Sequence, residues 1–145
     1  MEWQLTFDCA GPERMVAFWA EALGYRPKPP PEGFTTWRDY YLSLGVPADE
    51  LDCGDCCDRL VDPEGRGPAI WFQVVPEGKV TKNRLHLDLF VGGGRQVPLP
   101  QRRERVDGKV ASLLAAGATT LRTTEETDHY YVVLQDPEGN EFCVA

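Results

Sequence analysis

Apolar and polar residues follow two different periods along the chain. Alternation, the period of strands with one buried face, leads us to expect strands at residues 2–9, 68–75, 83–91, 119–124, 129–135 and 140–145. Residues 12–23 and roughly 101–116 instead carry apolar side chains at helical spacing, and a glycine follows each stretch. Residues 37–44 are also predicted to form a strand. Two helices set among strands indicate an α+β fold.

One turn sequence occurs twice, as DPEG at residues 62–65 and again at residues 136–139. It is typical of a type I turn, because the aspartate accepts from backbone N–H groups and proline presets φ. Each turn comes after a helix, a glycine and further strands, and another strand follows it. We therefore expect two copies of one unit, a first module over about residues 1–77 and a second over about 83–145, within a single domain spanning 1–145.

Composition and charge narrow the classes of partner. The chain has 145 residues and a formal net charge of −8, so neither nucleic acid nor an anionic membrane is expected to be its main partner. The N-terminus has neither basic residues nor a long apolar run, and no stretch approaches the length of a membrane span. Five cysteines are an odd count, which suits a reducing compartment. These features predict a cytoplasmic protein.

Three of the cysteines, Cys53, Cys56 and Cys57, lie together among acidic residues. A zinc knuckle needs a second pair of Cys or His ligands at a suitable distance, and the sequence shows none. The cluster is interpreted as an acidic surface loop with free or adventitiously oxidised thiols. A metal site is the alternative.

Each predicted strand has one strongly apolar side and one mixed side. In a sheet covered by helices on one face, the apolar sides meet the helices and the other sides face solvent or a cavity. The mixed sides carry Gln4, Thr6, Asp8, Trp71, Gln73, His86, Asp88, Tyr131, Glu141 and Cys143. A concave surface with aromatic walls and a few polar groups is the usual composition of a small-molecule pocket. The alternative is that this set faces water or another subunit.

Several stretches of the chain resemble one known family. They are residues 8–14 (DCAGPER), 17–25 (AFWAEALGY), 84–89 (RLHLDL) and 136–142 (DPEGNEF). Together they resemble the glyoxalase/bleomycin resistance/dioxygenase superfamily, also called vicinal oxygen chelate proteins, and are most similar to its glyoxalase-like domain branch. The resemblance implies tandem βαβββ modules that form an eight-stranded cup-shaped mixed sheet, with helices on the outside. It also implies a homodimer and, in many members, a divalent metal in the cup.

The family's metal-ligand positions fall on Gln4, Gln73, His86 and Cys143 in this chain. Only His86 matches the usual set of histidine and glutamate, and neutral amides are poor ligands for a catalytic divalent ion. A shifted site, with Glu141 or Asp88 joining His86, is the alternative. His86 and Glu141 are therefore both the catalytic candidates and the candidate metal ligands.

These observations favour a protein that binds a small molecule in the cup, with no metal or only a weakly bound one. The expected ligand-binding residues are Gln4, Trp37, Trp71, Gln73, Asp88, Tyr131 and Cys143. Aromatic residues and negative charge suggest a cationic or aromatic guest, as in the drug-sequestering branch. The alternative is a lyase, isomerase or ring-cleaving dioxygenase that uses His86 to hold zinc, nickel, iron or manganese. Metal-free acid–base catalysis by His86 is a third possibility.

Overall fold

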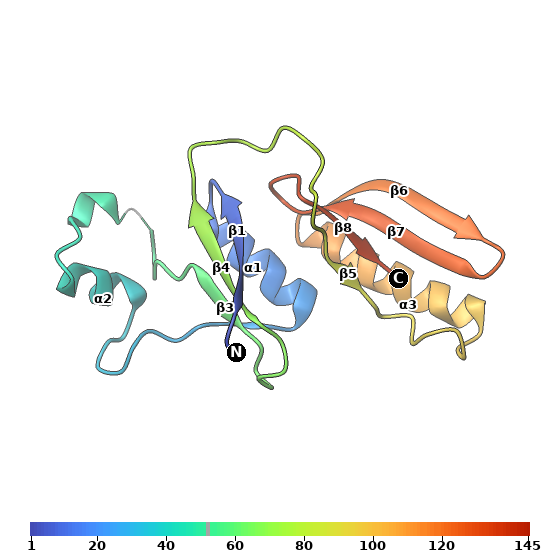
Figure 1. The fold of residues 1–145 in the computed structure, drawn as a ribbon, viewed down its shortest axis with the longest axis horizontal. Helices are drawn as coiled ribbons and strands as arrows, with labels where there is room; N and C mark the ends of the chain where they lie inside the picture. The colour runs from blue at the N-terminus through green and yellow to red at the C-terminus, as the bar shows by residue number, and fades with distance from the viewer. Residues whose placement is uncertain (52) are drawn as a thin grey trace. The chain divides into compact units, whose positions relative to one another are not determined.

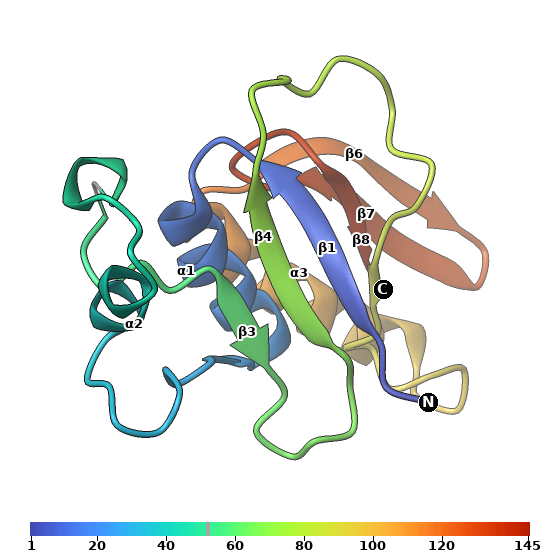
Figure 2. The same cartoon turned by 60° about the vertical axis from the view of Figure 1, so that its left-hand side comes forward.

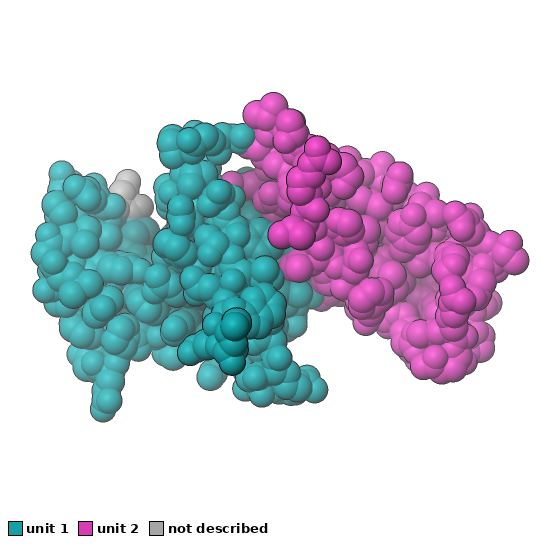
Figure 3. All heavy atoms as spheres, in the orientation of Figure 1, with its two compact units in different colours: residues 1–78 teal, residues 79–145 magenta. Residues whose placement is uncertain are grey.

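The computed structural model describes residues 1–51 and 53–145. It divides the chain into two compact units, Met1–Gly78 (unit 1) and Lys79–Ala145 (unit 2) (Figures 1 and 3). The boundary, between Gly78 and Lys79, falls between the two predicted modules. Each unit contains one four-stranded mixed sheet, which confirms the predicted α+β class. Among the residues described, no helix has the length and apolar character needed to cross a membrane.

Unit 1 consists of a strand, a helix and three further strands. These elements are β1 (Gln4–Cys9), α1 (Pro12–Leu23), β2 (Arg26–Pro27), β3 (Arg59–Val61) and β4 (Ala69–Val74). The order across the sheet is β1-β4-β3-β2, with β1 and β4 parallel and the other neighbours antiparallel. The helix starts where Pro12 needs no N–H partner, and it ends at Gly24, whose φ of 68° is left-handed.

The apolar side of this sheet packs against α1 (Figure 2). Phe72 and Trp19 are each 1% exposed, and the Phe7 ring centroid lies 5.3 Å from that of Trp19 and 5.7 Å from that of Phe72. The alternation predicted for β1 is thus present. Alternation over the predicted strand 2–9 would place Trp3 on this buried side, but Trp3 precedes β1 and is 60% exposed.

Unit 2 repeats the same arrangement. Its elements are β5 (Asp88–Leu89), α3 (Leu99–Ala115), β6 (Thr119–Glu126), β7 (His129–Gln135) and β8 (Glu141–Val144). The order β5-β8-β7-β6 matches that of unit 1, with β5 and β8 parallel. The tandem βαβββ modules are therefore confirmed as topology within each unit. The joining of both sheets into one eight-stranded cup stays a prediction.

The strand predicted at residues 83–91 is mostly irregular. Only Asp88 and Leu89 pair with β8, and Leu85, expected to be buried, is 85% exposed. Alternating apolar residues are buried on one face only where hydrogen bonds pair the segment with a neighbouring strand of the sheet. The short ladder of β5 therefore leaves the segment before it on the surface.

The strand predicted at residues 37–44 is wrong, because α2 (Trp37–Ser43) occupies this segment. The Thr36 hydroxyl accepts a hydrogen bond from the Asp39 backbone N–H at 3.0 Å, which caps the helix N-terminus. An apolar run this short does not distinguish a strand from a helix, whereas a threonine cap followed by an acid in the first turn favours the helix.

Residues 28–51 and 53–58, between β2 and β3, form an insertion that carries α2 and a 3₁₀ turn, η1 (Ala48–Glu50). In unit 2 the corresponding strands β6 and β7 are joined by Thr127 and Asp128 alone. The insertion has its own small core, composed of Trp37, Leu51, Cys56 and Cys57. The prediction of a surface cysteine loop is therefore wrong for Cys56 and Cys57, each 8% exposed, and Cys56 forms a disulfide with Cys53.

Candidate functional site

A hollow of about 290 Å³ lies in unit 2, on side chains of the sheet face opposite α3 and on the segment before β5. It combines apolar, cationic, thiol, imidazole and carboxylate groups. The residues that line it are Lys82, His86, Leu121, Arg122, Val133, Glu141, Phe142 and Cys143. Two groups expected to share a pocket, His86 and Glu141, thus line the same hollow.

Strand register places four residues in and beside this hollow in one row across the sheet. Asp88 on β5 pairs with Cys143 on β8, Cys143 pairs with Val133 on β7, and Val133 pairs with Arg122 on β6. The register of β6 shifts between Thr120 and Arg122, so Leu121 is an extra residue at a bulge. A bulge redirects neighbouring side chains, and here both Leu121 and Arg122 line the hollow.

His86, Asp88 and Cys143 form a compact cluster whose possible ligand atoms all lie within 4.8 Å of one another. His86 Nε2 lies 3.4 Å from Asp88 Oδ1. Burial, together with a hydrogen bond to the Asp88 carboxylate, raises the pKa of the Cys143 thiol, while Arg122 and Lys82 act in the opposite direction. The thiol is therefore protonated near neutral pH, but both cations lie near enough to act on it.

Whether the site suits a divalent metal depends on the donor atoms that this cluster offers. One imidazole nitrogen, one carboxylate oxygen and one sulfur are a donor set that zinc accepts. The residues fit such an ion in type and spacing, with Cys143 losing its proton on binding. The grouping differs from the expected His86–Glu141 pair, because Asp88 and Cys143 are the residues gathered around the imidazole.

Glu141 is already engaged by other groups. Its carboxylate accepts from the Asn83 backbone N–H and from Lys79 Nζ, each at 3.0 Å. The Asn83 hydrogen bond, and after it the Lys79 contact, lowers the pKa of Glu141 to about 2, although burial opposes the shift. So weakly basic a carboxylate accepts a proton poorly at neutral pH, which argues against the expected role of Glu141 as a catalytic base.

Replacing Glu141 by glutamine is expected to reduce the acid sensitivity of the fold. The folded-state pKa of about 2 lies below the ordinary value of 4.5, so this carboxylate stabilises the fold above pH 4.5 and loses that contribution as the pH falls toward 2. Chemical unfolding across this interval should show a shallower pH slope for Glu141→Gln than for the wild type. The exposed Glu126→Gln change is the control, and equal slopes for wild type and Glu141→Gln would contradict the assignment.

The other expected ligand-binding residues belong to other elements of the fold. Gln4, Trp71 and Gln73 are on unit 1, on the face of β1 and β4 opposite α1. Tyr131 is on β7, opposite Thr124 of β6, and it does not line the hollow described above. Trp37 is 3% exposed in the core of the insertion, so it is not on a strand face as expected.

The two tryptophans expected to bind a guest already contact groups of the chain itself. The Arg59 guanidinium lies 5.0 Å from the Trp37 ring centroid and 5.5 Å from that of Trp71. Trp37 Nε1 donates to the Lys28 carbonyl and Trp71 Nε1 donates to Asp58 Oδ2, each at 2.7 Å. Because Arg59 is the cation at both rings, the structure does not support the expectation of a cationic guest between them.

Sequence reasoning missed the two cations of the hollow. Lys82 falls between the two predicted modules, and Arg122 falls in a predicted strand with no expected role. The signal for Arg122 is weak, because only the bulge at Leu121 turns its side chain toward the hollow. Charge alone did not distinguish it from the other basic residues of the chain.

The family model described as "Glyoxalase-like domain" matches residues 4–145. No curated protein matches the chain. Among solved structures, the chain is similar to a glyoxalase/bleomycin resistance protein/dioxygenase family enzyme from Burkholderia phytofirmans, with a TM-score of 0.58, 20% identity and coverage of 97% of this chain and 94% of that one.

Fosfomycin resistance proteins are also similar in structure. FosX from Listeria monocytogenes, in complex with Mn(II) and 1S,2S-dihydroxypropylphosphonic acid, matches with a TM-score of 0.57 and 9% identity, covering 97% of this chain and 85% of that one. FosX from Mesorhizobium loti matches with a TM-score of 0.58 and 9% identity, covering 99% and 89%. At such identities these matches show the fold alone.

Proposed function

The chain belongs to the glyoxalase-like domain family, and from that premise we propose that it binds a small organic anion in the hollow of unit 2. The observation that carries the proposal is the pair of cationic side chains, Lys82 and Arg122, that line this hollow together with His86. The proposal retains the expected small-molecule ligand and changes the expected charge of that ligand.

The charges around the hollow favour an anion. Its one lining carboxylate, Glu141, is neutralised by Lys79 at 3.0 Å. Lys82 and Arg122 both act to lower the pKa of the Cys143 thiol, although burial and the Asp88 carboxylate raise it, so both cations act at the same point. Arginine and lysine side chains bind phosphonate and carboxylate groups through charge-assisted hydrogen bonds. Lys79, Lys82 and Arg122 together outnumber the carboxylates Glu141 and Asp88, in a chain whose net charge is −8.

Size and apolar lining restrict the anion to a small organic one. Leu121 and Val133 provide apolar wall, and the volume of about 290 Å³ is at the lower end for ligand pockets. The similar FosX of Listeria monocytogenes was solved with a small phosphonic acid, which is an anion of this class. We therefore assign a compact phosphonate or carboxylate with an apolar part as the ligand class.

Three probes that share a phenyl group test the charge of the ligand. Phenylphosphonate should bind the full chain at low salt with a dissociation constant on the order of 0.1–1 mM, as expected for a ligand of about ten non-hydrogen atoms. Benzyl alcohol and benzylammonium are the neutral and cationic controls, and both should bind at least about tenfold more weakly. Calorimetric titration measures all three. Preferential binding of benzylammonium would contradict the proposal of an anionic ligand and favour the cationic ligand expected from the sequence.

A divalent-metal-dependent activity is the second candidate, favoured by the cluster of His86, Asp88 and Cys143. In this case these three residues would hold the ion, which would supply Lewis-acid catalysis on an oxygen of the bound anion. Lys82 and Arg122 would still orient the anion. Lyase, isomerase and ring-cleaving dioxygenase activities remain the proposed classes.

Titration of chelator-treated protein with zinc, nickel, iron and manganese tests this candidate. Binding tighter than millimolar that is lost in His86→Ala supports it. If the protein binds phenylphosphonate in the presence of chelator and binds no metal more tightly than millimolar, the metal-free binding function is supported instead. Dimer formation also stays a prediction, and light scattering on the eluting protein measures it.

A further inference from the structure

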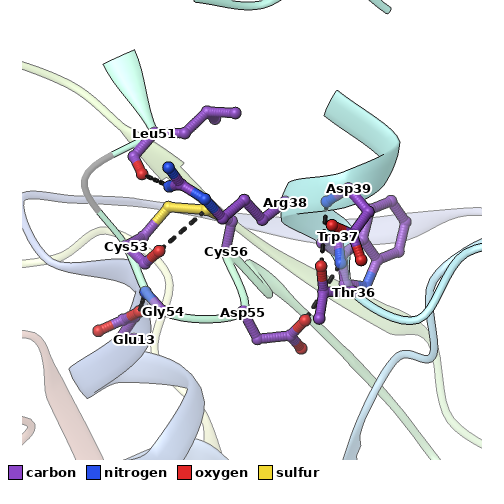
Figure 4. The surroundings of a disulfide bond; sticks show 10 residues. All are labelled: Glu13, Thr36, Trp37, Arg38, Asp39, Leu51, Cys53, Gly54, Asp55 and Cys56. Carbon is purple, nitrogen blue, oxygen red and sulfur yellow. Dashed lines mark hydrogen bonds between the residues drawn. A yellow bond between two sulfur atoms is a disulfide. The ribbon is translucent and has the colours of Figure 1, made fainter. Parts of the chain in front are cut away.

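The disulfide of the insertion joins Cys53 and Cys56, whose Cα atoms are 5.0 Å apart (Figure 4). Only Gly54 and Asp55 separate them in the sequence. A ring this small restricts the unfolded chain less than the long loops that structural disulfides close. Two cysteines at this spacing are instead typical of disulfides that exchange with thiols.

The two sulfurs differ in access. Cys53 is half-buried and lines a second hollow, of about 590 Å³, whereas Cys56 is 8% exposed in the core of the insertion. Arg38 lines the same hollow as Cys53, as do the acidic Glu13 and Asp49. The Arg38 guanidinium in the hollow that Cys53 lines favours the approach of a thiolate, and Glu13 and Asp49 oppose it, so the difference in burial between the two cysteines decides. Attack from solvent is therefore directed to Cys53, with Cys56 as the leaving sulfur.

The loop that carries the disulfide is also held by hydrogen bonds that do not depend on it. The Gly54 N–H donates to Glu13 Oε1 of α1 at 2.7 Å, and the Trp37 N–H donates to Asp55 Oδ1 at 3.1 Å. The Arg38 guanidinium donates to the Leu51 carbonyl. Cys56 Sγ lies 3.5 Å from the Cys53 carbonyl oxygen, so a reduced Cys56 thiol has an acceptor in place. The dithiol form therefore fits the same loop.

Cys57 adjoins the disulfide without competing for it. Its thiol is 3.4 Å from the Arg59 carbonyl and 3.7 Å from the Lys28 carbonyl, and it donates to them. Burial raises the pKa of this thiol, and a protonated thiol is a poor nucleophile. Exchange is thereby restricted to the Cys53–Cys56 pair.

We propose that Cys53–Cys56 is a thiol–disulfide exchange site through which a low-molecular-weight thiol reduces the insertion. The thiolate of the first thiol attacks Cys53 Sγ, the bond to Cys56 breaks, and Cys56 leaves as a thiolate that takes a proton from water. A second thiolate attacks the external sulfur of the mixed disulfide and releases Cys53. Two thiols give two electrons to the protein disulfide and leave as their own disulfide.

Native reduction of the full chain by millimolar glutathione tests the proposal. Alkylation followed by peptide mapping should show both Cys53 and Cys56 as thiols without denaturant, and oxidised glutathione should restore the bond. The matched variants Cys56→Ser and Cys53→Ser each leave one thiol of the pair. Oxidised glutathione should label the first variant, at Cys53, at least about tenfold faster than the second variant at Cys56.

Three results would overturn the proposal. One is a bond that glutathione reduces only after denaturation, which would make it structural. Another is equal labelling of Cys53 and Cys56 in the two variants. The third is a dithiol that oxidised glutathione does not close. Where a variant fails to fold, peptide mapping of the wild type still decides between native reduction and resistance.

Discussion

Replacing Arg122 by alanine is expected to weaken the binding of phenylphosphonate by about 10- to 30-fold at low salt, the cost of one charge-assisted hydrogen bond at a solvent-accessible site. Arg122 lines the hollow of unit 2 and acts on the Cys143 thiol, so its charge reaches the bound anion. Calorimetric titration of wild type and variant measures the change. The difference should shrink as salt is added, because exposed charges are screened.

Arg84→Ala is the matched control for this experiment. Arg84 has the same charge as Arg122 and lies, like Lys82, in the segment before β5, but it is not among the residues that line the hollow. Its removal should change the dissociation constant by less than about twofold. Lys82→Ala, on the hollow, should weaken binding in the same direction as Arg122→Ala. Equal losses of phenylphosphonate affinity in Arg84→Ala and Arg122→Ala would mean that only the overall charge matters, which would contradict the assigned site.

The duplicated fold could be predicted from the sequence because the same turn and helix-end residues occur in the same order in each module. The two DPEG turns and the glycines after α1 and α3 mark corresponding points, and the structure gives both units the same strand order. The insertion has no counterpart in unit 2, so the repeat gave no guide to it. There a short apolar run was assigned to a strand, although Thr36 caps a helix.

Part of the candidate site was also accessible. Alternation along β8 places Glu141 and Cys143 on one face, and the ladder with β5 brings Asp88 opposite Cys143. Pairing partners of a residue depend on register, which a strand's own sequence does not specify. The position of Arg122 depends on a bulge, and the neutralisation of Glu141 depends on Lys79 from the linker. Both features arise only from tertiary structure, and both support the proposed anionic ligand in place of the expected cationic one.

Replacing Asp136 by alanine is expected to destabilise the protein by about 3 kcal/mol, because it leaves several half-buried donors without an acceptor. Asp136 is 3% exposed, and its Oδ1 accepts from the backbone N–H groups of Glu138 and Asn140, each at 2.9 Å. The Asn140 side-chain amide donates to both carboxylate oxygens, at 3.2 and 2.9 Å. Chemical denaturation measures the loss of unfolding free energy.

The repeat supplies the control for this experiment. Asp62 occupies the same place in the first DPEG turn and accepts from the N–H groups of Glu64, Arg66 and Gly67. Glu64 and Arg66 are exposed, so water replaces the lost acceptor and Asp62→Ala should destabilise the protein clearly less than Asp136→Ala. The two turns share a sequence and differ in burial. Equal losses would mean that turn geometry, rather than desolvation of the donors, sets the cost.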